Sequence, residues 1–275
     1  MKRFLLGVST GALVLSAATA DAWAYHTKDD RPTDGTAYTK KRGSLRAGLW
    51  KLEASIFDEV TIGTATLPWL LVVWNAHAKA KLYDEDPLAI SVGAAFRYLD
   101  LGRFEAISDK HVDARLLVVP LEAWGSYRFD DEWTLSLGGV WTGSKLTGTY
   151  DPASFRGTAA TSNFQTVGNL TWTLSDVVAL NLEGRYLVVQ KASAQARTTL
   201  HPDDFTTVEV QATAATDAVD YPNAFSLVPS IHLSWSWFNL KVGLGYGNFN
   251  IPGVNFMLPD RTLVPELDIY GVFWP

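Results

Sequence analysis

The segment from Phe225 to Trp237, FSLVPSIHLSWSW, sorts its side chains onto two faces. Its odd-numbered positions carry Phe, Leu, Pro, Ile, Leu, Trp and Trp, whereas its even-numbered positions carry four serines, a valine and His232. Successive side chains of an extended chain point to opposite faces, so this alternation predicts a β-strand with one apolar and one polar side. In a soluble sandwich the apolar side forms the core, whereas in a membrane barrel it meets lipid and the polar side lines a lumen.

The N-terminus, MKRFLLGVSTGALVLSAATADAWA, has the pattern of an export signal. Lys2 and Arg3 precede an apolar run, and small residues suited to cleavage after Ala20 or Ala24 follow it. The run is well short of the roughly 20 residues that a spanning helix needs. We therefore expect a secretory signal peptide over residues 1–24 and a polar segment over 25–43, with a candidate short first strand at Thr36 to Lys40.

The remaining sequence leaves one way to cross a membrane. No other segment is apolar for long enough to span as a helix, and the longest, Leu67 to Trp74, is less than half the needed length. That segment does not alternate, and it is either a connection at the lipid interface or a strand end buried on both faces. Lipid offers no partner for backbone N–H and C=O groups, so only a closed barrel could span. The chain has no cysteine, so no disulfide holds an exported fold, and its net charge of −6 argues against a nucleic-acid partner.

Alternating segments recur in pairs joined by short turns. The turns are expected around FDEV at 57–60, DEDP at 84–87, DDEW at 130–133, Ser175 and Asp176, and Phe238 and Asn239, and Leu45 to Ile56 reads as one strand. Longer polar stretches near 102–112, 150–160, 194–223 and 250–261 separate the pairs. Short connections on one side and long ones on the other are typical of membrane barrels, and the count predicts about twelve antiparallel strands, within roughly 10 to 14, over residues 44–275.

The last segment, LVPELDIYGVFWP, alternates an apolar set ending in Phe273 with Glu266, Asp268 and Tyr270. An apolar-alternating C-terminal strand with an aromatic at its end resembles the assembly signal of Gram-negative outer-membrane β-barrel proteins, although Trp274 and Pro275 follow the ring here. Together with the export signal, this resemblance covers the whole chain at the level of a class. It implies a location in the bacterial outer membrane, contact with outer-membrane lipid, and handling by periplasmic chaperones and the barrel-assembly machinery.

The polar parity of these strands predicts a charged lumen. Its basic candidates outnumber its acidic ones, so an open lumen would favour anions, whereas a closed one would pair the charges into a structural network. Closure of the barrel also brings the last strand beside the first, which predicts a bridge from Lys51 to Glu266 or Asp268. The lumen candidates are Lys51, Lys79, Lys81, Arg97, Arg128, Arg185, Lys191 and Lys241, then Glu53, Glu122, Glu183, Glu266 and Asp268, together with His77 and His232.

Two features could suggest other chemistry. His232 lies between Ser230 and Ser234, but same-face neighbours on one strand are roughly 7 Å apart, too far for a direct bond. The 194–223 stretch has five acidic side chains near His201 (Asp203, Asp204, Glu209, Asp217 and Asp220), without the spacing of a calcium loop. We read it as a solvated loop, in which FTTVEVQATA either extends a strand or forms a hairpin.

The sequence thus predicts an all-β, closed antiparallel transmembrane barrel without a cofactor or a catalytic site. A barrel of about twelve strands is wider than the packed small barrels and narrower than the large porins. We expect a narrow channel or a structural barrel for small polar solutes, with a mildly basic lumen. A lipid-modifying hydrolase and an adhesion or assembly barrel that acts through its outer loops are the alternatives.

Overall fold

The computed structural model describes residues 33–70, 73–100, 102, 112–150, 155–203, 206–216, 223–235, 237–250 and 257–273. The expected signal peptide lies outside these residues. The described elements are β1 (Leu45–Gly48), β2 (Lys51–Phe57), β3 (Val60–Ala65), α2 (Thr66–Leu70), β4 (Trp74–Glu85), β5 (Leu88–Asp100), β6 (Val112–Arg128), β7 (Trp133–Tyr150), β8 (Phe155–Thr173), β9 (Val178–Asp203), β10 (Thr206–Thr216), β11 (Phe225–Trp235), β12 (Phe238–Asn250) and β13 (Met257–Phe273).

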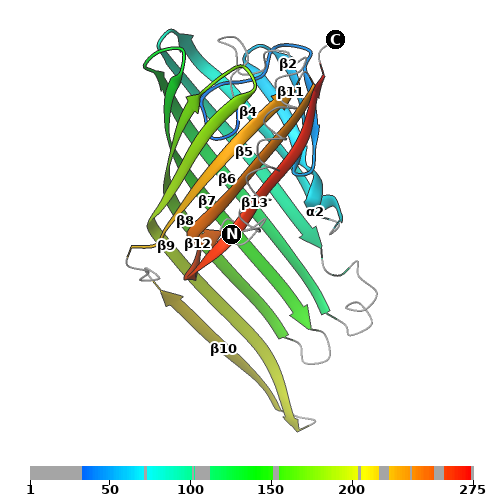
Figure 1. Ribbon diagram of the computed structural model, residues 1–275. Coiled ribbons are helices and arrows are strands. Elements are labelled where there is room, and N and C mark those ends of the chain that lie inside the picture. The colour runs from blue at the N-terminus through cyan, green and yellow to red at the C-terminus, as the bar shows by residue number, and fades with distance from the viewer. Residues whose placement is uncertain are drawn as a thin grey trace, which may run out of the picture.

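Twelve of these strands form a closed antiparallel barrel (Figure 1). Neighbours along the chain pair in order, β9 pairs with β11, and β13 returns to β1 from Leu45 opposite Phe273 to Gly48 opposite Tyr270. The remaining strand, β10, pairs with β9 beyond the barrel. The prediction of a closed antiparallel barrel of about twelve strands is therefore confirmed.

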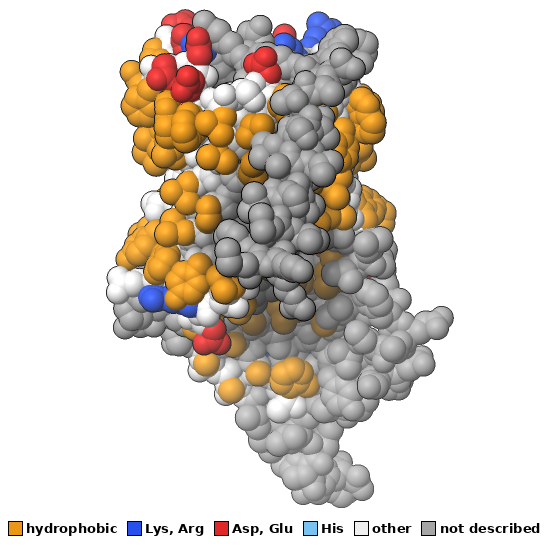
Figure 2. All heavy atoms as spheres, in the orientation of Figure 1, with side chains coloured by type: hydrophobic (Ala, Val, Ile, Leu, Met, Phe, Trp, Pro, Cys, Tyr) orange, Lys and Arg blue, Asp and Glu red, His pale blue; other side chains and the backbone are white. Residues whose placement is uncertain are grey.

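Side chains alternate between an apolar outer face and a polar interior. Along β6, Leu117, Leu121 and Tyr127 are exposed, while Trp124 and Ser126 are buried. Figure 2 shows hydrophobic side chains gathered across the outer surface, with charged ones near the end that carries the short turns. This apolar-outside, polar-inside arrangement is that of a membrane barrel. Among the described residues, no helix is long and apolar enough to cross a membrane.

Aromatic rings gather where the short turns join the strands. Trp133 stacks on Trp172, with ring centroids 5.0 Å apart, across the β7–β8 pair. The ring of Phe273 in the last strand stacks on Trp237 in the β11–β12 turn, with centroids 5.7 Å apart. Rings at this level are typical of the interfacial belt of a membrane barrel, where one side of the ring meets lipid and the other meets water.

Several element boundaries differ from the prediction. Residues 45–56 are two strands, because the chain turns at Leu49 and Trp50 and β1 pairs back onto β2. Thr36 to Lys40 is not a strand. β11 ends at Trp235 and β12 begins at Phe238, so the connection between them comes two residues earlier than expected. Leu67 to Trp74 contains the end of α2 and the start of β4, and Trp69 meets Trp74 edge-on at 5.4 Å.

The connections at the end of the barrel opposite the short turns are shorter than expected, because the strands extend into them. β7 and β8 continue to the pair of Tyr150 with Phe155, so the expected loop at 150–160 shrinks to residues 151–154. β9 continues to Asp203 and β10 folds back along it, which makes the FTTVEVQATA stretch a hairpin that projects beyond the barrel (Figure 1). The hairpin alternative for this stretch is therefore the correct one.

A β-bulge in β9 reverses its face. Gln165 of β8 lies opposite Leu187 and Phe164 lies opposite Val189, so one extra residue is inserted into β9. The alternation shifts by one position beyond a bulge. Gln190 is accordingly buried and Lys191 is exposed, and the placement of Lys191 on the lumen face was wrong.

The wall of the barrel is short on one side. β1, β2 and β3 have 4, 7 and 6 residues, whereas β13 has 17. Within the described part of the chain, β13 therefore has no strand partner on its β1 side from Met257 to Glu266, which we call the open edge. The carbonyl of Leu267 points to this side, where it accepts the indole N–H of Trp50 at 2.5 Å. Pro265 has the same parity, so its missing N–H falls at the open edge, as expected for an unpaired strand.

Candidate functional site

The described residues from Thr33 to Lys40, ahead of β1, lie inside the barrel and touch its wall at several points. We call Thr33 to Lys40 the lumen segment. The N–H of Ala37 donates to Ser126 Oγ of β6 at 2.7 Å, and Lys79 Nζ of β4 donates to the carbonyls of Thr33 and Thr36 at 2.9 and 2.5 Å. These bonds run from the segment to side chains on the lumen faces of two different strands. The segment therefore occupies the space that a porin would leave to water.

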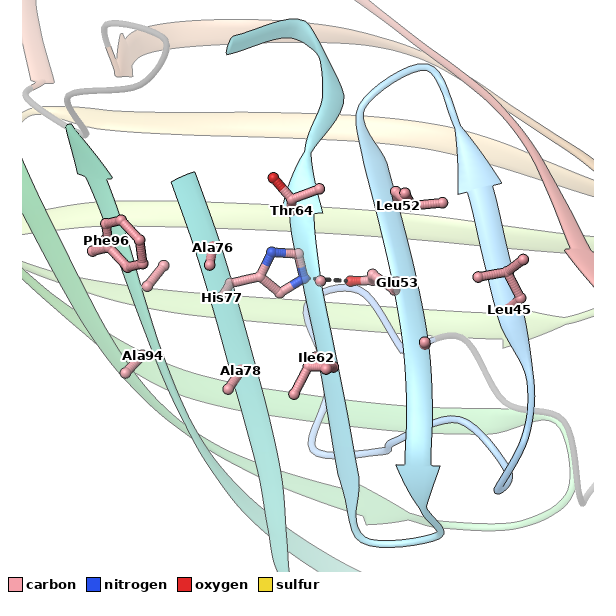
Figure 3. A pocket seen from close by; sticks show the side chains of 13 residues that line it. Leu45, Leu52, Glu53, Ile62, Thr64, Ala76, His77, Ala78, Ala94 and Phe96 are labelled. Atoms are coloured by element: carbon pink, nitrogen blue, oxygen red, sulfur yellow. Dashed lines mark hydrogen bonds and ion pairs between the residues drawn. The ribbon is translucent and has the colours of Figure 1, made fainter. Parts of the chain in front are cut away.

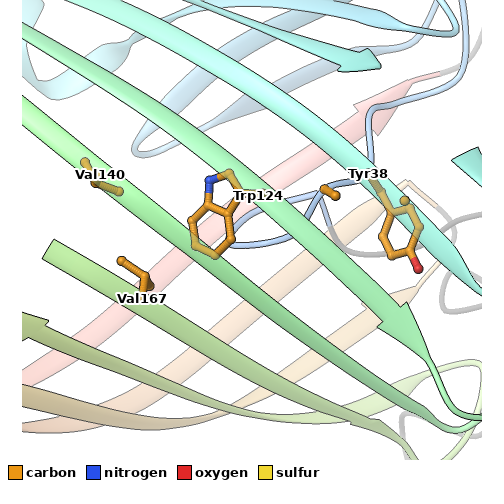
Figure 4. Close-up of a cluster of buried hydrophobic side chains, with 6 residues drawn as sticks. Tyr38, Trp124, Val140 and Val167 are labelled. Carbon is orange, nitrogen blue, oxygen red and sulfur yellow. The ribbon is translucent and has the colours of Figure 1, made fainter. Parts of the chain in front are cut away.

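Apolar contacts complete this docking. Ala37 and Tyr38 are buried against the cluster of Ala89, Trp124, Val140 and Val167, which comes from four consecutive strands (Figure 4). Gly35 has a φ of 66° and approaches β8 so closely that an added Cβ would lie 2.7 Å from Asn169 Nδ2. A glycine is needed there both for the left-handed backbone and for the space.

Arg46 is the centre of an ionic cluster that joins the lumen segment to the wall. Its guanidinium is 1% exposed and lies 2.5 Å from Asp34 Oδ2, 3.5 Å from Glu53 Oε2 and 2.6 Å from Asp268 Oδ2. The guanidinium carbon also lies 3.9 Å from the ring centroid of Tyr270, a cation–π contact. One buried cation thus links the segment, β2 and β13.

The predicted bridge from Lys51 to Glu266 or Asp268 is wrong. Lys51 Nζ contacts Asp34 Oδ1 at 2.7 Å, Asp268 is held by Arg46, and Glu266 is held by Lys241 at 2.6 Å. The reason is that β1 is a separate short strand between β2 and β13, so Arg46 of β1 is the nearer cation to Asp268.

The titration of the lumen segment follows from these charges. Burial raises the pKa of the Asp34 carboxyl, but the charges of Arg46, Lys51 and Lys40 outweigh burial and hold the pKa well below 3.8. Burial lowers the pKa of Lys40 from 10.5 to about 8, against the opposing effect of Glu53. The charge of Asp34 therefore stabilises the docked segment above pH 3.8, and this stabilisation is lost as the pH falls below that value. Burial of the charged Lys40 is unfavourable, and this cost decreases as the pH rises from 8 to 10.5.

Glu53 and His77 meet across the strand between them. Figure 3 shows the two side chains reaching toward each other from β2 and β4, and Nε2 of His77 lies 3.0 Å from Glu53 Oε1. Gly63 of β3 makes room, because an added Cβ would lie 2.8 Å from both Glu53 Cγ and His77 Cε1. On the lipid side of the same strands lies a shallow apolar groove lined by small residues such as Ala54, Ala76, Ala78 and Ala94 (Figure 3).

A cavity of about 540 Å³ remains between the lumen segment and the strands. Six acidic and four basic side chains line it, so the basic excess expected for the lumen is absent from this lining. Lys40 and Arg46 contact the same carboxylates from behind, which brings the described charges around the cavity into balance. The charged lining consists of Asp34, Glu53, Glu122, Glu183, Glu266 and Asp268 with Lys51, Lys79, Arg185 and Lys241.

Besides Lys191, four of the predicted lumen residues do not line this cavity: Lys81, Arg97, Arg128 and His232. Lys81 contacts Asp84 at 2.6 Å and Arg128 contacts Asp86, both beside the short β4–β5 turn. Glu183 and Arg185 pair with each other at 2.8 Å in the cavity lining. His232 is buried on the lumen face of β11, and Arg97 is half-buried on β5.

The hydrolase alternative concerned His232 and the serines beside it on β11. The hydroxyl of Ser234 donates to Asn239 Oδ1 at 2.7 Å. Among the described residues, no group of three or more His, Asp or Glu side chains is arranged to hold a metal ion. Of the acidic residues expected near His201, Asp203 ends β9 and Glu209 lies in β10, whereas Asp204, Asp217 and Asp220 lie outside the described residues.

Sequence reasoning missed Asp34, Lys40 and Arg46. One signal was available: in the segment read as a single strand, Arg46 is even-numbered while Lys51 and Glu53 are odd-numbered. Charges that change parity within one strand indicate a turn between them. The docking of Asp34 and Lys40 in the lumen had no such signal, because an irregular segment has no periodicity.

A scan against protein-family models finds no match, and a search of curated proteins finds none. Among solved structures, the chain is similar to the TodX deltaS2S3 mutant monoaromatic hydrocarbon channel (TM-score 0.46, 11% identity, 83% of this chain and 65% of that one). It is also similar to the P. putida toluene transporter TodX (0.44, 10%, 84% and 66%) and the CymD monoaromatic hydrocarbon channel (0.38, 10%, 93% and 95%). The chain spans just under two thirds of the length of the first two. What the chain has in common with them is its fold, a closed antiparallel β-barrel.

Proposed function

We propose that this protein is a narrow outer-membrane channel for small polar solutes, whose passage is restricted by the lumen segment. The observation that carries the proposal is the cavity of about 540 Å³ that remains inside the closed barrel after the segment is docked. Cavities of this size accommodate small organic molecules. A barrel with a purely structural lumen would be expected to fill this space with side chains.

The charges around the cavity refine the expected selectivity. An unpaired basic lining would attract anions. Here Lys51 and Lys241 contact Asp34 and Glu266, and Arg185 contacts Glu183, so the basic groups are matched by carboxylates. This pairing supports a weakly charge-selective channel in place of the anion preference that was expected for an open lumen with unpaired basic groups.

Planar-bilayer recording of the purified protein tests this proposal. We expect small discrete currents from the wild type. The indole of Trp124 borders the cavity and holds the lumen segment, so Trp124→Ala should raise the unit conductance roughly twofold as the constriction widens. The matched control is Leu121→Ala on the same strand, whose side chain faces outward and whose loss should leave the conductance unchanged.

The absence of current from both the wild type and Trp124→Ala would reject conduction. Equal conductance changes in Trp124→Ala and Leu121→Ala would reject the assignment of the constriction to the lumen. The hydrolase and adhesion alternatives stay hypotheses, the second of them with the projecting β9–β10 hairpin as its candidate contact surface.

A further inference from the structure

We propose that the cavity binds a small uncharged molecule with an O–H or N–H donor on an apolar body, seated between Trp50 and the carboxylates of Glu266 and Asp268. This inference rests on the proposed function, because the cavity is the solute site of the proposed channel. It names the chemical class of the solute for this chain, which the barrel fold alone does not give.

Two carboxylate oxygens call for a donor. Asp268 Oδ1 and Glu266 Oε2 are buried atoms without a hydrogen-bond partner among the described residues, while the second oxygen of each is held by Arg46 and Lys241, both at 2.6 Å. Asp268 as a whole is only 7% exposed. Both side chains belong to the lumen face of β13, two positions apart, and both line the cavity. A buried acceptor without a donor is costly, so a solute that supplies one gains binding energy.

The balance of charge selects an uncharged solute. The carboxylates around the cavity are matched in number by the lysines and arginines described above, with His77 bonded to Glu53. An ammonium or a carboxylate brought into this cluster would leave one buried charge without a counter-charge, which is unfavourable. A hydroxyl or a neutral N–H satisfies the two oxygens without this cost.

The rim beside the two oxygens is apolar. Trp50, Val264 and Pro265 line the cavity next to Glu266, at the open edge of β13. The indole N–H of Trp50 is already used by the carbonyl of Leu267, so its ring is what it presents to a solute. Apolar side chains with a few convergent polar groups are the usual composition of a small-molecule site. The polar end of the solute is therefore expected at the carboxylates and its apolar body at this rim.

Ligand-observed saturation-transfer NMR on the full barrel in nanodiscs tests the site with four probes that share one ring. Benzyl alcohol supplies a neutral donor, benzyl methyl ether has the same oxygen without a donor, and benzylamine and benzoate are charged at neutral pH. We expect benzyl alcohol to bind roughly tenfold more tightly than the ether, in line with one hydrogen bond to a charged acceptor. Both charged probes should bind more weakly than the alcohol.

Variants distinguish binding of benzyl alcohol at the site from its partition into the lipid. Glu266→Gln should weaken binding of benzyl alcohol roughly tenfold. Glu59→Gln is the same change at an exposed turn and should have no effect. Val264→Phe fills the rim but keeps both carboxylates, and should also remove binding, so the result does not depend on one variant that disturbs Lys241. Far-ultraviolet circular dichroism checks that each variant is folded.

The inference is overturned if the ether binds as well as the alcohol, if benzylamine binds more tightly than the alcohol, or if Glu266→Gln and Val264→Phe both bind like the wild type. Binding is measured without voltage or current. A protein that binds benzyl alcohol but passes no current would refute the channel and keep the site, and a conducting protein that binds none of the probes would refute only the site.

Discussion

At the scale of single residues, Arg46 links three parts of the chain, although it was not among the lumen residues predicted from the sequence. Its buried guanidinium joins Asp34, Glu53 and Asp268, which come from the lumen segment, β2 and β13. A buried ion pair contributes little net stability when intact, but removing one partner leaves the other charges uncompensated. The loss of Arg46 should therefore lower the stability of the barrel by more than the intact ionic cluster contributes to it.

We predict that Arg46→Met lowers the free energy of unfolding by about 3–5 kcal/mol, because three carboxylates lose their shared cation. Urea unfolding of the refolded barrel in detergent measures this change. Arg115→Met is the control, since Arg115 and its partner Asp113 are both largely exposed, and the expected loss is below about 1 kcal/mol. Similar losses in the two variants would contradict a special role for the buried cluster.

The contrast between Arg46 and Lys191 shows what sequence alternation can and cannot predict. Alternation assigned Glu53 and Asp268 to the inward parity, and both side chains are buried in the structure. It misplaced Lys191, because an inserted residue in β9 shifts the parity and no residue type marks that insertion. It also could not predict the partners of Lys51, which depend on where the irregular lumen segment comes to rest.

At the scale of elements, strand existence was predictable and strand length was not. The β7 and β8 strands continue to the pair of Tyr150 with Phe155 and include Gly157 and Thr158, which were expected to lie in a polar connection. The open edge of β13 was equally hidden, since it follows from the shortness of β1, β2 and β3 and not from β13 itself. Pro259 and Pro265 are the residues of β13 that mark this edge in the sequence.

We predict that Pro265→Ala promotes dimers, because alanine restores an N–H donor at the open edge and an unprotected edge invites strand pairing. Chemical cross-linking followed by gel electrophoresis should show a dimer band that the wild type lacks. Pro229→Ala is the matched control, because β11 has paired neighbours on both sides and its new N–H does not face an open edge. A dimer band in both variants, or in neither, would argue against the protective role of Pro265.

At the scale of the whole molecule, the two ends of the barrel are distinct. One end carries the short turns, and the other carries the β9–β10 hairpin (Figure 1). In outer-membrane barrels the short turns face the periplasm and the longer connections face outward. The sequence was sufficient to distinguish the two ends of the barrel, because turn lengths can be counted without knowing the register of any strand.

This orientation can be tested by cysteine labelling, since the chain has no native cysteine. We predict that Gln211→Cys on the projecting hairpin reacts with a membrane-impermeant maleimide on intact cells. Asp131→Cys in the β6–β7 turn should react only after the outer membrane is opened. Both positions are exposed, so exposure does not explain the difference. Labelling of Asp131→Cys alone on intact cells would mean that the barrel is inserted the other way round.

The pairing of β1 with β13 decides how this barrel comes apart. Four pairs, from Leu45–Phe273 to Gly48–Tyr270, join these strands and three join β1 to β2, whereas eighteen pairs join β7 to β8. Regions with the fewest backbone bonds open first under stress. Arg46 and Asp268 form their ion pair across this short seam. Separation of the strands should therefore begin at β1, and Arg46, which pairs with Asp268 across this seam and with Asp34 of the lumen segment, should delay it.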